Sequence, residues 1–442
     1  MRIQLSDHFS YGHLMRFTFP SVIMLVFTSI YGVVDGFFVS NYVGKTPFAA
    51  VNFIMPLLMI LGCVGFMFGT GGGALIAKTL GEGEEERAQE IFSLIVYTSI
   101  LCGILLSVCG FAFLPSVASL MGAKGQLLTD SIRYGRVILA AIPFYVLQYE
   151  FQCLFATAGK PKLGLYVTAA AGIANIVLDA LFVVVFRWGL EGAAAATAFS
   201  QFIGGVIPLI YFGRENDSLL NLVRCRPDRR ILVRACTNGS SELMSNLSMS
   251  VVNMLYNIQL MRHAGEDGIA AYGVLMYVSL VFQAVFLGYS VGSAPVISYH
   301  YGAGDQKELR GLLRKSILLT GVFAISMFAL GQMLAGPLSY IFVGYDTGLV
   351  ELTIRGFRFF SCSFLFSGFA IFGSSFFTAL GDGLISAMIS FLRTLVFQCA
   401  AVLIFPIFWA VDGIWLSIVA AEVLAAGVAF LLLAGKRKQY GY

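Results

Sequence analysis

The sequence predicts an all-α polytopic membrane protein, with twelve transmembrane helices in two homologous six-helix lobes. Two observations carry this fold class. Apolar residues make up 58% of the chain and charged residues 12%, against roughly 45–50% and about 25% in soluble domains. The second half also repeats the first, because residues 71–90 return as residues 292–311, an offset of 221 in a chain of 442. A duplicated and mostly apolar chain is typical of a two-lobed membrane transporter.

Long apolar runs set the number of spans. A helix that crosses a bilayer needs about 20 apolar residues, and the sequence contains twelve runs of that kind, six in each half. The predicted spans are residues 17–42, 51–77, 91–114, 134–157, 163–186, 193–212, 236–261, 271–299, 313–336, 357–379, 384–409 and 413–434.

A polar stretch at the midpoint divides the chain into domains. We expect an N-lobe at residues 1–213, a basic cytoplasmic linker at residues 214–235 and a C-lobe at residues 236–442. Leu219 and Leu220 stand among arginines in this linker. This mixture indicates a short segment that rests on anionic lipid headgroups.

The distribution of Lys and Arg predicts the orientation in the cell membrane. With both termini in the cytoplasm, 19 of the 28 Lys and Arg residues lie inside, 8 lie outside and Arg393 lies within a span. Cytoplasmic loops carry such an excess of positive charge. The net charge of +4 is therefore a topology signal and does not indicate a nucleic-acid partner. The N-terminus lacks the pattern of a cleaved signal peptide.

Motifs of enzymes and nucleotide-driven pumps are missing from the sequence. It contains no GxxxxGK[ST] phosphate loop and no HExxH zinc motif, and its eight cysteines lack CxxC spacing. The GTGGG run at 69–73 lies within an apolar span, where Gly65, Gly69 and Gly73 at four-residue spacing favour close helix packing over anion binding. We therefore expect neither an enzyme nor a bound cofactor.

A few ionisable residues inside the spans are the candidate functional site. A carboxylate at the centre of a bilayer costs roughly 2.5–3.5 kcal/mol, so such residues usually face a cavity and have a function. Asp35 lies in the first span, and Asp179 lies in the fifth with Asn175 one helical turn earlier on the same face. Thr197 follows in the sixth span. These oxygen atoms suit a hard cation such as Na+, and two neighbouring carboxylates equally suit proton uptake.

Other polar residues within the spans are weaker candidates for a substrate cavity. Glu150 is as well placed to bind substrate or a proton as to reach an interface. Glu242 starts the second half and is expected to face a central cavity. Arg393 needs a carboxylate partner or water, and a structural pair is as well supported as a role in transport. The complete set of cavity candidates is Glu150, Glu242, Asn246, Asn253, Asn257 and Arg393.

At these residues the chain resembles the multidrug and toxic compound extrusion (MATE) family over nearly its whole length. Asp35, the Asn175-x-x-x-Asp179 pair and Thr197 match the cation-binding residues of its DNA-damage-inducible-F-like branch. Pro20 matches the proline at which the first helix of that family is proposed to bend. The resemblance implies a V-shaped pair of lobes and assigns cation coupling to the first lobe.

Glu242 matches an acidic position that the other bacterial branch uses at the start of its seventh helix. The tenth-helix carboxylate of that branch is absent, because residues 357–379 contain no Asp or Glu. The repeat supports the same assignment, since Asp35 falls on Tyr256 and Asp179 falls on Ala400 under the 221-residue offset. The predicted ion site is thus confined to the first copy.

The family implies an antiporter that admits H+ or Na+ and expels small lipophilic, often cationic, compounds by alternating access. We expect a monomer whose other contacts are membrane lipids. A flippase for lipid-linked saccharides is the nearest alternative, but the acidic pair outweighs the single buried Arg393 and favours cationic cargo or coupling ions. A membrane enzyme would need a nucleophile or metal set that the sequence lacks, and a passive channel would not need the repeat with its midplane acidic site.

Overall fold

The computed structural model describes residues 4–344 and 346–442, except for the side chains of residues 40, 45 and 46, and this part of the chain is helical with short connections. Short π-helical turns (η) continue three of the helices. In chain order the elements are α1 (Tyr11–Phe38), η1 (Val39–Val43), α2 (Lys45–Gly81), α3 (Glu85–Leu120), α4 (Gly125–Thr157), α5 (Pro161–Asp179), η2 (Ala180–Val185), α6 (Gly189–Gly213), α7 (Arg229–Gly302), α8 (Gln306–Val343), α9 (Thr347–Ser361), α10 (Phe364–Ala379), α11 (Gly383–Phe391), η3 (Leu392–Phe397) and α12 (Gln398–Tyr440).

The predicted twelve-helix membrane fold is confirmed. Nine helices of the described residues are long and apolar enough to cross a membrane, and α9 with α10 makes a tenth span that is bent by 46°. Two of the nine are interrupted by residues with non-helical backbone, α7 at Gly265 and the helix from Gly383 to Tyr440 at Ala410. Each interrupted helix holds two spans, which brings the ten to twelve.

The tenth span differs from the prediction. It begins at Thr347, ten residues before the predicted start at 357. The first part, α9, carries Glu351, Arg355 and Arg358 on its exposed face, while apolar residues cover the buried face. These charged residues interrupt the apolar run. The apolar pattern of a span is therefore continuous only from about residue 357 onward.

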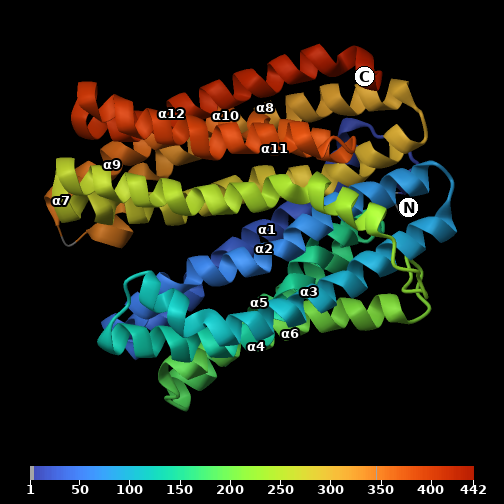
Figure 1. Cartoon of the computed structure of the whole chain (residues 1–442). Helices are drawn as coiled ribbons and strands as arrows, with labels where there is room; N and C mark the ends of the chain where they lie inside the picture. Colours follow the sequence, from blue (N-terminus) through green and yellow to red (C-terminus); the bar gives the residue numbers. More distant parts are fainter. Residues whose placement is uncertain (1–3, 345) are drawn as a thin grey trace.

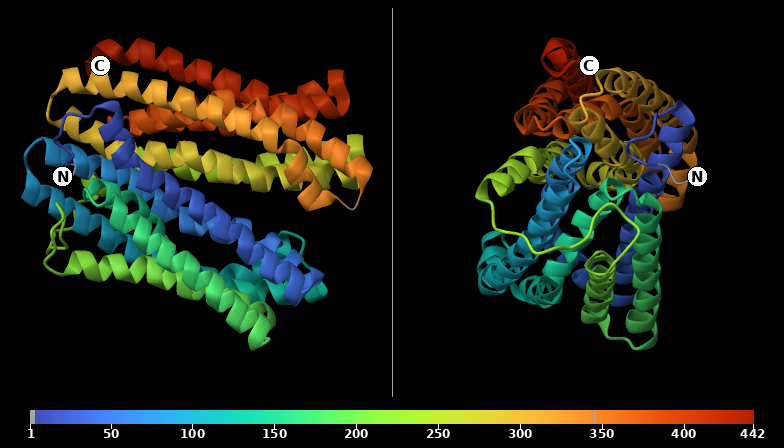
Figure 2. Two further views of the ribbon diagram at one scale, coloured as in Figure 1. Left: turned by 180° about the vertical axis from the view of Figure 1, so that it is seen from behind. Right: turned by 90° about the vertical axis from the view of Figure 1, so that its right-hand side faces the viewer.

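The two lobes form a V. Figure 1 shows α1 to α6 as one lobe and α7 to α12 as the other, close together at the end where both chain termini lie and apart at the opposite end. We call the end where both chain termini lie the terminal end. The right-hand view of Figure 2 shows the linker crossing this end of the bundle from α6 to α7. The linker extends from 214 to 228, because α7 already begins at Arg229.

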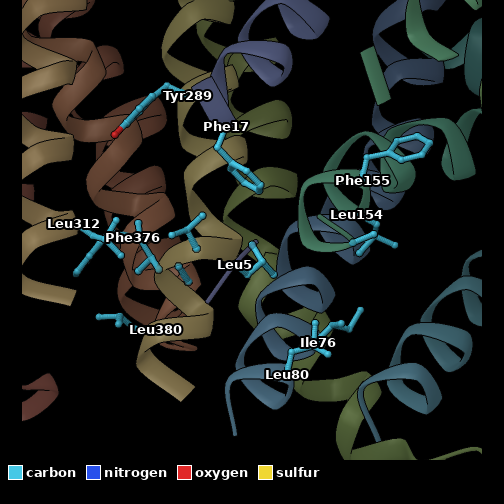
Figure 3. Packing of buried hydrophobic residues seen from close by; sticks show 14 of the residues in the cluster. Leu5, Phe17, Ile76, Leu80, Leu154, Phe155, Tyr289, Leu312, Phe376 and Leu380 are labelled. Atoms are coloured by element: carbon cyan, nitrogen blue, oxygen red, sulfur yellow. The ribbon is translucent and has the colours of Figure 1, made fainter. Parts of the chain in front are cut away.

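The hydrophobic core follows the V. The largest cluster joins both lobes at the terminal end, where Leu5, Ile76 and Phe155 of the N-lobe belong to the same cluster as Leu312 and Phe376 of the C-lobe (Figure 3). Toward the opposite end the core divides into a C-lobe cluster and a separate N-lobe cluster. Apolar burial therefore holds the lobes together at one end and stabilises each lobe separately at the other.

Glycines with positive φ form the same turns in both halves. Gly44 (φ 125°) precedes the second span and Gly265 (φ 64°) precedes the eighth. Gly83 (φ 83°) and Gly304 (φ 71°) lie in the connections that follow those spans. Each pair is separated by 221 residues, and positive φ strains most residues that carry a Cβ. The repeated glycines of the sequence therefore mark turns that the two halves share.

Glycines also allow α2 and α7 to touch through their backbones at the terminal end. A Cβ added to Gly81 would lie 2.0 Å from the carbonyl oxygen of Tyr299, and one added to Gly302 would lie 2.1 Å from that of Lys78. Lys78 and Gly81 correspond to Tyr299 and Gly302 under the 221-residue offset. The two contacts are therefore related by the internal symmetry of the chain.

Similar contacts continue along both helices. A Cβ on Gly239 would lie 1.9 Å from the carbonyl oxygen of Met67, and one on Gly71 would lie 2.1 Å from that of Ala235. Small residues that let helix backbones approach closely are a common basis of helix association in membranes. The Gly65, Gly69 and Gly73 run does the same against α4 within the N-lobe, as the sequence predicted.

The segment before α1 binds the C-lobe at the terminal end. Leu5 and Phe9 are buried, and the Phe9 amide donates a hydrogen bond to Glu308 Oε1 at 3.0 Å. His8 Nδ1 lies 2.7 Å from the other oxygen of Glu308, and Lys315 lies 3.7 Å from Glu308 and donates to the Phe9 carbonyl. This segment adds a polar connection between the lobes where their backbones meet.

The linker packs on protein more than the sequence predicted. Leu220 is fully buried in the core cluster, and the amide of Leu222 donates to the Phe212 carbonyl at 2.8 Å. The amide of Val223 donates to Ser93 Oγ at 2.8 Å. The expectation that Leu220 rests on lipid headgroups is therefore wrong, because the ends of α3 and α6 provide a protein surface for it.

We expect Gly239→Val to destabilise the contact between the lobes. The new side chain would collide with the Met67 carbonyl, and overpacking of this kind costs about 1–3 kcal/mol. The melting temperature in detergent measures the effect. Gly427→Val is the matched control, because that helical glycine has open space where its Cβ would lie. Equal melting temperatures for the two variants would contradict the glycine contact.

Candidate functional site

Three helices of the N-lobe bring together the predicted cation-coupling residues. Asp35 comes from α1, Asn175 and Asp179 from α5, and Thr197 from α6. Thr197 Oγ1 donates a long hydrogen bond to Asp35 Oδ1 at 3.5 Å, and the carboxyl groups of Asp35 and Asp179 are neighbours that interact electrostatically. The arrangement places two carboxylates, one amide and one hydroxyl in a single cluster, which we call the acidic cluster.

The acidic cluster is buried and incompletely satisfied. Asp35 is 7% exposed, Asn175 1% and Asp179 not at all. Both carboxyl oxygens of Asp179 and Oδ1 of Asn175 lack a hydrogen-bond partner among the described residues. Buried polar atoms are nearly always hydrogen-bonded, so such orphaned oxygens indicate a missing ligand or proton. The residues present therefore fit a bound cation or a shared proton.

Two tyrosines complete the surroundings of the acidic cluster, and the sequence analysis missed both. Tyr31 lies one turn before Asp35 on α1, and its hydroxyl accepts a 3.5 Å hydrogen bond from Gln148. Tyr134 of α4 is fully buried beside Thr197 and is an electrostatic neighbour of both carboxylates. The four-residue spacing from Asp35 indicates Tyr31, whereas nothing in the sequence connects Tyr134 to this site.

A second site lies between the lobes at the base of the V. A cavity of about 30 Å³ is enclosed by α2 and α4 of the N-lobe and by α7 and α10 of the C-lobe. Glu242 is its acidic wall residue, and Thr70, Thr157, Ser290 and Thr378 add hydroxyl groups. The volume holds about two water molecules. Glu242 thus faces a small space of mixed polarity that both lobes share.

Arg393 forms a buried ion pair within the C-lobe. Its Nε donates to Glu422 at 2.8 and 3.0 Å, and the two side chains are 12% and 1% exposed. Arg393 also lines a cavity of about 20 Å³ that contains Tyr256, the counterpart of Asp35 under the repeat. The C-lobe thus has a neutral ion pair near the position equivalent to that of the acidic cluster.

The remaining candidates for a substrate cavity do not line the central cavity between the lobes. Glu150 is fully buried in α4 with Ser99 and Cys102 of α3 as neighbours, and neither of its oxygens has a hydrogen-bond partner among the described residues. Asn246 donates to the Glu242 carbonyl at 2.8 Å one turn away.

Asn253 and Asn257 do not line the central cavity between the lobes. Asn253 accepts a 2.9 Å hydrogen bond from Tyr272 within the C-lobe, and Asn257 is exposed.

Pro20 is buried inside a continuous α1, so a bend at this proline stays a prediction.

The acidic cluster differs from a transition-metal site. Among the described residues, no group of three or more His, Cys, Asp and Glu side chains lies close enough together to hold a metal ion. Two carboxylates with amide and hydroxyl oxygens are instead the ligands that hard cations prefer.

The comparisons with known proteins agree with the fold. A family model described as MatE matches residues 20–181 and 243–401. The chain is 25% identical over 434 residues to "Multidrug export protein MepA" of Staphylococcus saprophyticus, covering 95% of this chain and 92% of the relative. It is 23% identical over 425 residues to the protein of the same name from Staphylococcus aureus, with the same coverage. A solved structure described as "Crystal structure of MATE in complex with MaL6" matches with a TM-score of 0.93 at 23% identity, over 98% of both chains.

We expect the Arg393–Glu422 pair to be structural. Removing one partner of a buried pair leaves an unpaired charge and costs about 3–5 kcal/mol, while replacing both with apolar residues is often neutral. Arg393→Met and Glu422→Leu should each lower the melting temperature in detergent, and the double variant should regain most of the loss. Additive losses in the double variant would contradict the pairing.

Proposed function

The chain belongs to the MatE family of membrane transporters, and on this premise we propose that it is a secondary active multidrug exporter. It admits H+ or Na+ and expels small lipophilic, often cationic, compounds by alternating access of the two lobes. The relatives with matching sequence are described as multidrug export proteins. The coupling ion binds at the acidic cluster of the N-lobe.

The observation that carries this proposal is the pair of buried carboxylates at Asp35 and Asp179. Two neighbouring charges of one sign are unfavourable, and burial raises the cost of each. A bound cation or a proton removes this cost, and its departure restores it. The occupancy of the site therefore changes the free energy of the surrounding helices, as a coupled transporter requires.

The form of the lobes supports alternating access. The lobes meet at the terminal end through backbone contacts and separate at the opposite end. With the termini in the cytoplasm, as the excess of Lys and Arg favours, the ends at which the lobes separate face outward. Rocking of the lobes about the base of the V would break the glycine contacts and open the cytoplasmic side.

The charges of the cavities favour cationic over anionic cargo. Glu242 is an acidic side chain in the central cavity, and Arg393, a buried guanidinium that interacts with it electrostatically, is bound to Glu422. A flippase for lipid-linked saccharides needs unpaired cations for the pyrophosphate. The flippase is the second candidate, and the pairing of Arg393 argues against it.

Transport in proteoliposomes tests the proposed function and separates the two ions. We expect an imposed pH gradient or an imposed Na+ gradient to drive accumulation of a fluorescent lipophilic cation, since the downhill ion supplies the free energy. The gradient that drives uptake identifies the coupling ion. No uptake under either gradient, for any of several lipophilic cations, would overturn the exporter.

Asp35→Asn and Asp179→Asn should each reduce gradient-driven uptake to the level of empty liposomes while the protein folds normally. Each amide keeps the size of the side chain but removes the charge that the coupling ion neutralises. Asp130→Asn is the matched control, because Asp130 is also buried in the N-lobe but is bound by Gln126 at 2.8 Å. Wild-type uptake by either cluster variant would show that coupling occurs elsewhere.

A further inference from the structure

A third cavity lies at the terminal end, where the N-lobe, the linker and the C-lobe meet. Its volume is about 390 Å³, more than ten times that of the central cavity. The start of α3, the end of the linker and the start of α7 line it. It therefore joins both lobes at a place that the proposed transport cycle does not explain.

Three guanidinium groups line this junction cavity, those of Arg87, Arg224 and Arg226. The cavity also contains two carboxylates, but Asp228 accepts a 2.8 Å hydrogen bond from the Arg230 amide as the N-cap of α7. Arg87 is also paired with Glu84 at 3.0 Å. The guanidinium groups that remain for a ligand are therefore those of Arg224 and Arg226, both exposed at the cavity.

The thiol in the junction cavity adds no negative charge. Burial, together with the nearby carboxylate of Glu90, raises the pKa of the Cys225 thiol, so the group is neutral at pH 7. Further positive charge stands just outside, at the exposed Arg229 and Arg230. The cavity is therefore suited to a small group with negative charge and several acceptor oxygens.

The linker holds its arginines in place. The amide of Val223 donates to Ser93 of α3, and the fully buried Leu220 anchors the preceding turn. Arg224 and Arg226 follow directly after this anchored backbone. A ligand at the cavity would consequently bind to a loop that is already ordered, and less conformational entropy would be lost on binding.

An apolar track leads from the junction cavity into the bilayer. Ile91 and Leu94 form the apolar wall of the cavity on α3. The same helical face continues through Leu101, Leu105 and Val108, which are 58%, 55% and 63% exposed. Spacings of three, four and seven residues keep these side chains on one face. An acyl chain in contact with this face would have its headgroup at the cavity.

We propose that the junction cavity binds the phosphate-bearing headgroup of an anionic phospholipid, whose acyl chains lie along the exposed face of α3. The arginines bind the phosphate oxygens, and the lipid connects α3 of the N-lobe with the start of α7 in the C-lobe. Basic pockets between membrane helices on the cytoplasmic side bind lipid headgroups in this way.

The test compares two double variants that remove equal charge. Arg224→Gln/Arg226→Gln changes the cavity, whereas Arg229→Gln/Arg230→Gln changes neighbouring arginines that do not line it. The apparent affinity for phosphatidylglycerol is measured in detergent from the rise in melting temperature and from lipid adducts in native mass spectrometry. We expect the cavity variant to bind roughly tenfold or more weakly and the control to change by about threefold or less.

Further arms separate the sources of the phosphate. Phosphatidylcholine, glycerol 1-phosphate and inorganic phosphate at matched concentrations should each give less stabilisation than phosphatidylglycerol. An equal loss of lipid affinity in the two double variants would mean that the lipid is attracted by the overall positive charge of this region. That result would overturn the site. Full stabilisation by glycerol 1-phosphate or inorganic phosphate would overturn the lipid as the ligand. Arg224→Gln, an exposed single change, provides the same test if the double variant fails to fold, with weaker lipid binding expected and unchanged binding contradicting the site.

Discussion

The close backbone approach of α2 and α7 is the constraint on which the rest of this structure depends. Gly81 and Gly302, with Gly71 and Gly239, bring main chains into contact where any Cβ would collide with a carbonyl oxygen. This contact joins the lobes at the terminal end, and the core divides toward the other end. In a bilayer little hydrophobic free energy is gained when two apolar helices meet, so fit between their surfaces decides association. A fit made of backbone and small residues is stable when closed, yet few interlocked side chains need to change rotamer when it opens.

The chemistry of the chain is less symmetric than its scaffold. Asp35 has Tyr256 as its counterpart, and the nearby cationic group of the C-lobe, Arg393, is neutralised by Glu422. A neutral ion pair has no net charge for an ion to compensate, whereas the acidic cluster has two carboxylates, and both oxygens of Asp179 lack a hydrogen-bond partner among the described residues. The duplicated helices thus provide two similar lobes. Under the proposed function, the unequal distribution of charge would decide which of them responds to the coupling ion.

Sequence reasoning reached the features that depend on local pattern. The glycine repeats identified the shared turns, and the one-turn spacing of Asn175 and Asp179 placed both on one face of α5. It missed features that depend on which distant helices become neighbours. Tyr134 reaches the site because α4 packs against α6, and Glu422 meets Arg393 across 29 residues of chain. The linker was misjudged for the same reason, since only the folded ends of α3 and α6 provide the surface that buries Leu220.

The first helix connects the ion site with the contact between the lobes. α1 carries Asp35 toward its end, while Thr18 and Val22 near its start touch Gly292 and Gly288 of the C-lobe. Pro20 lies within the second of these regions, between Thr18 and Val22, and has no amide to bond the carbonyl one turn earlier. Under the proposed function, a change of charge at Asp35 would alter the preferred position of the second half of α1 against α5 and α6. Because the start of α1 is packed on the C-lobe, such a movement would bear on the contact between the lobes, whereas a bend at Pro20 stays a prediction.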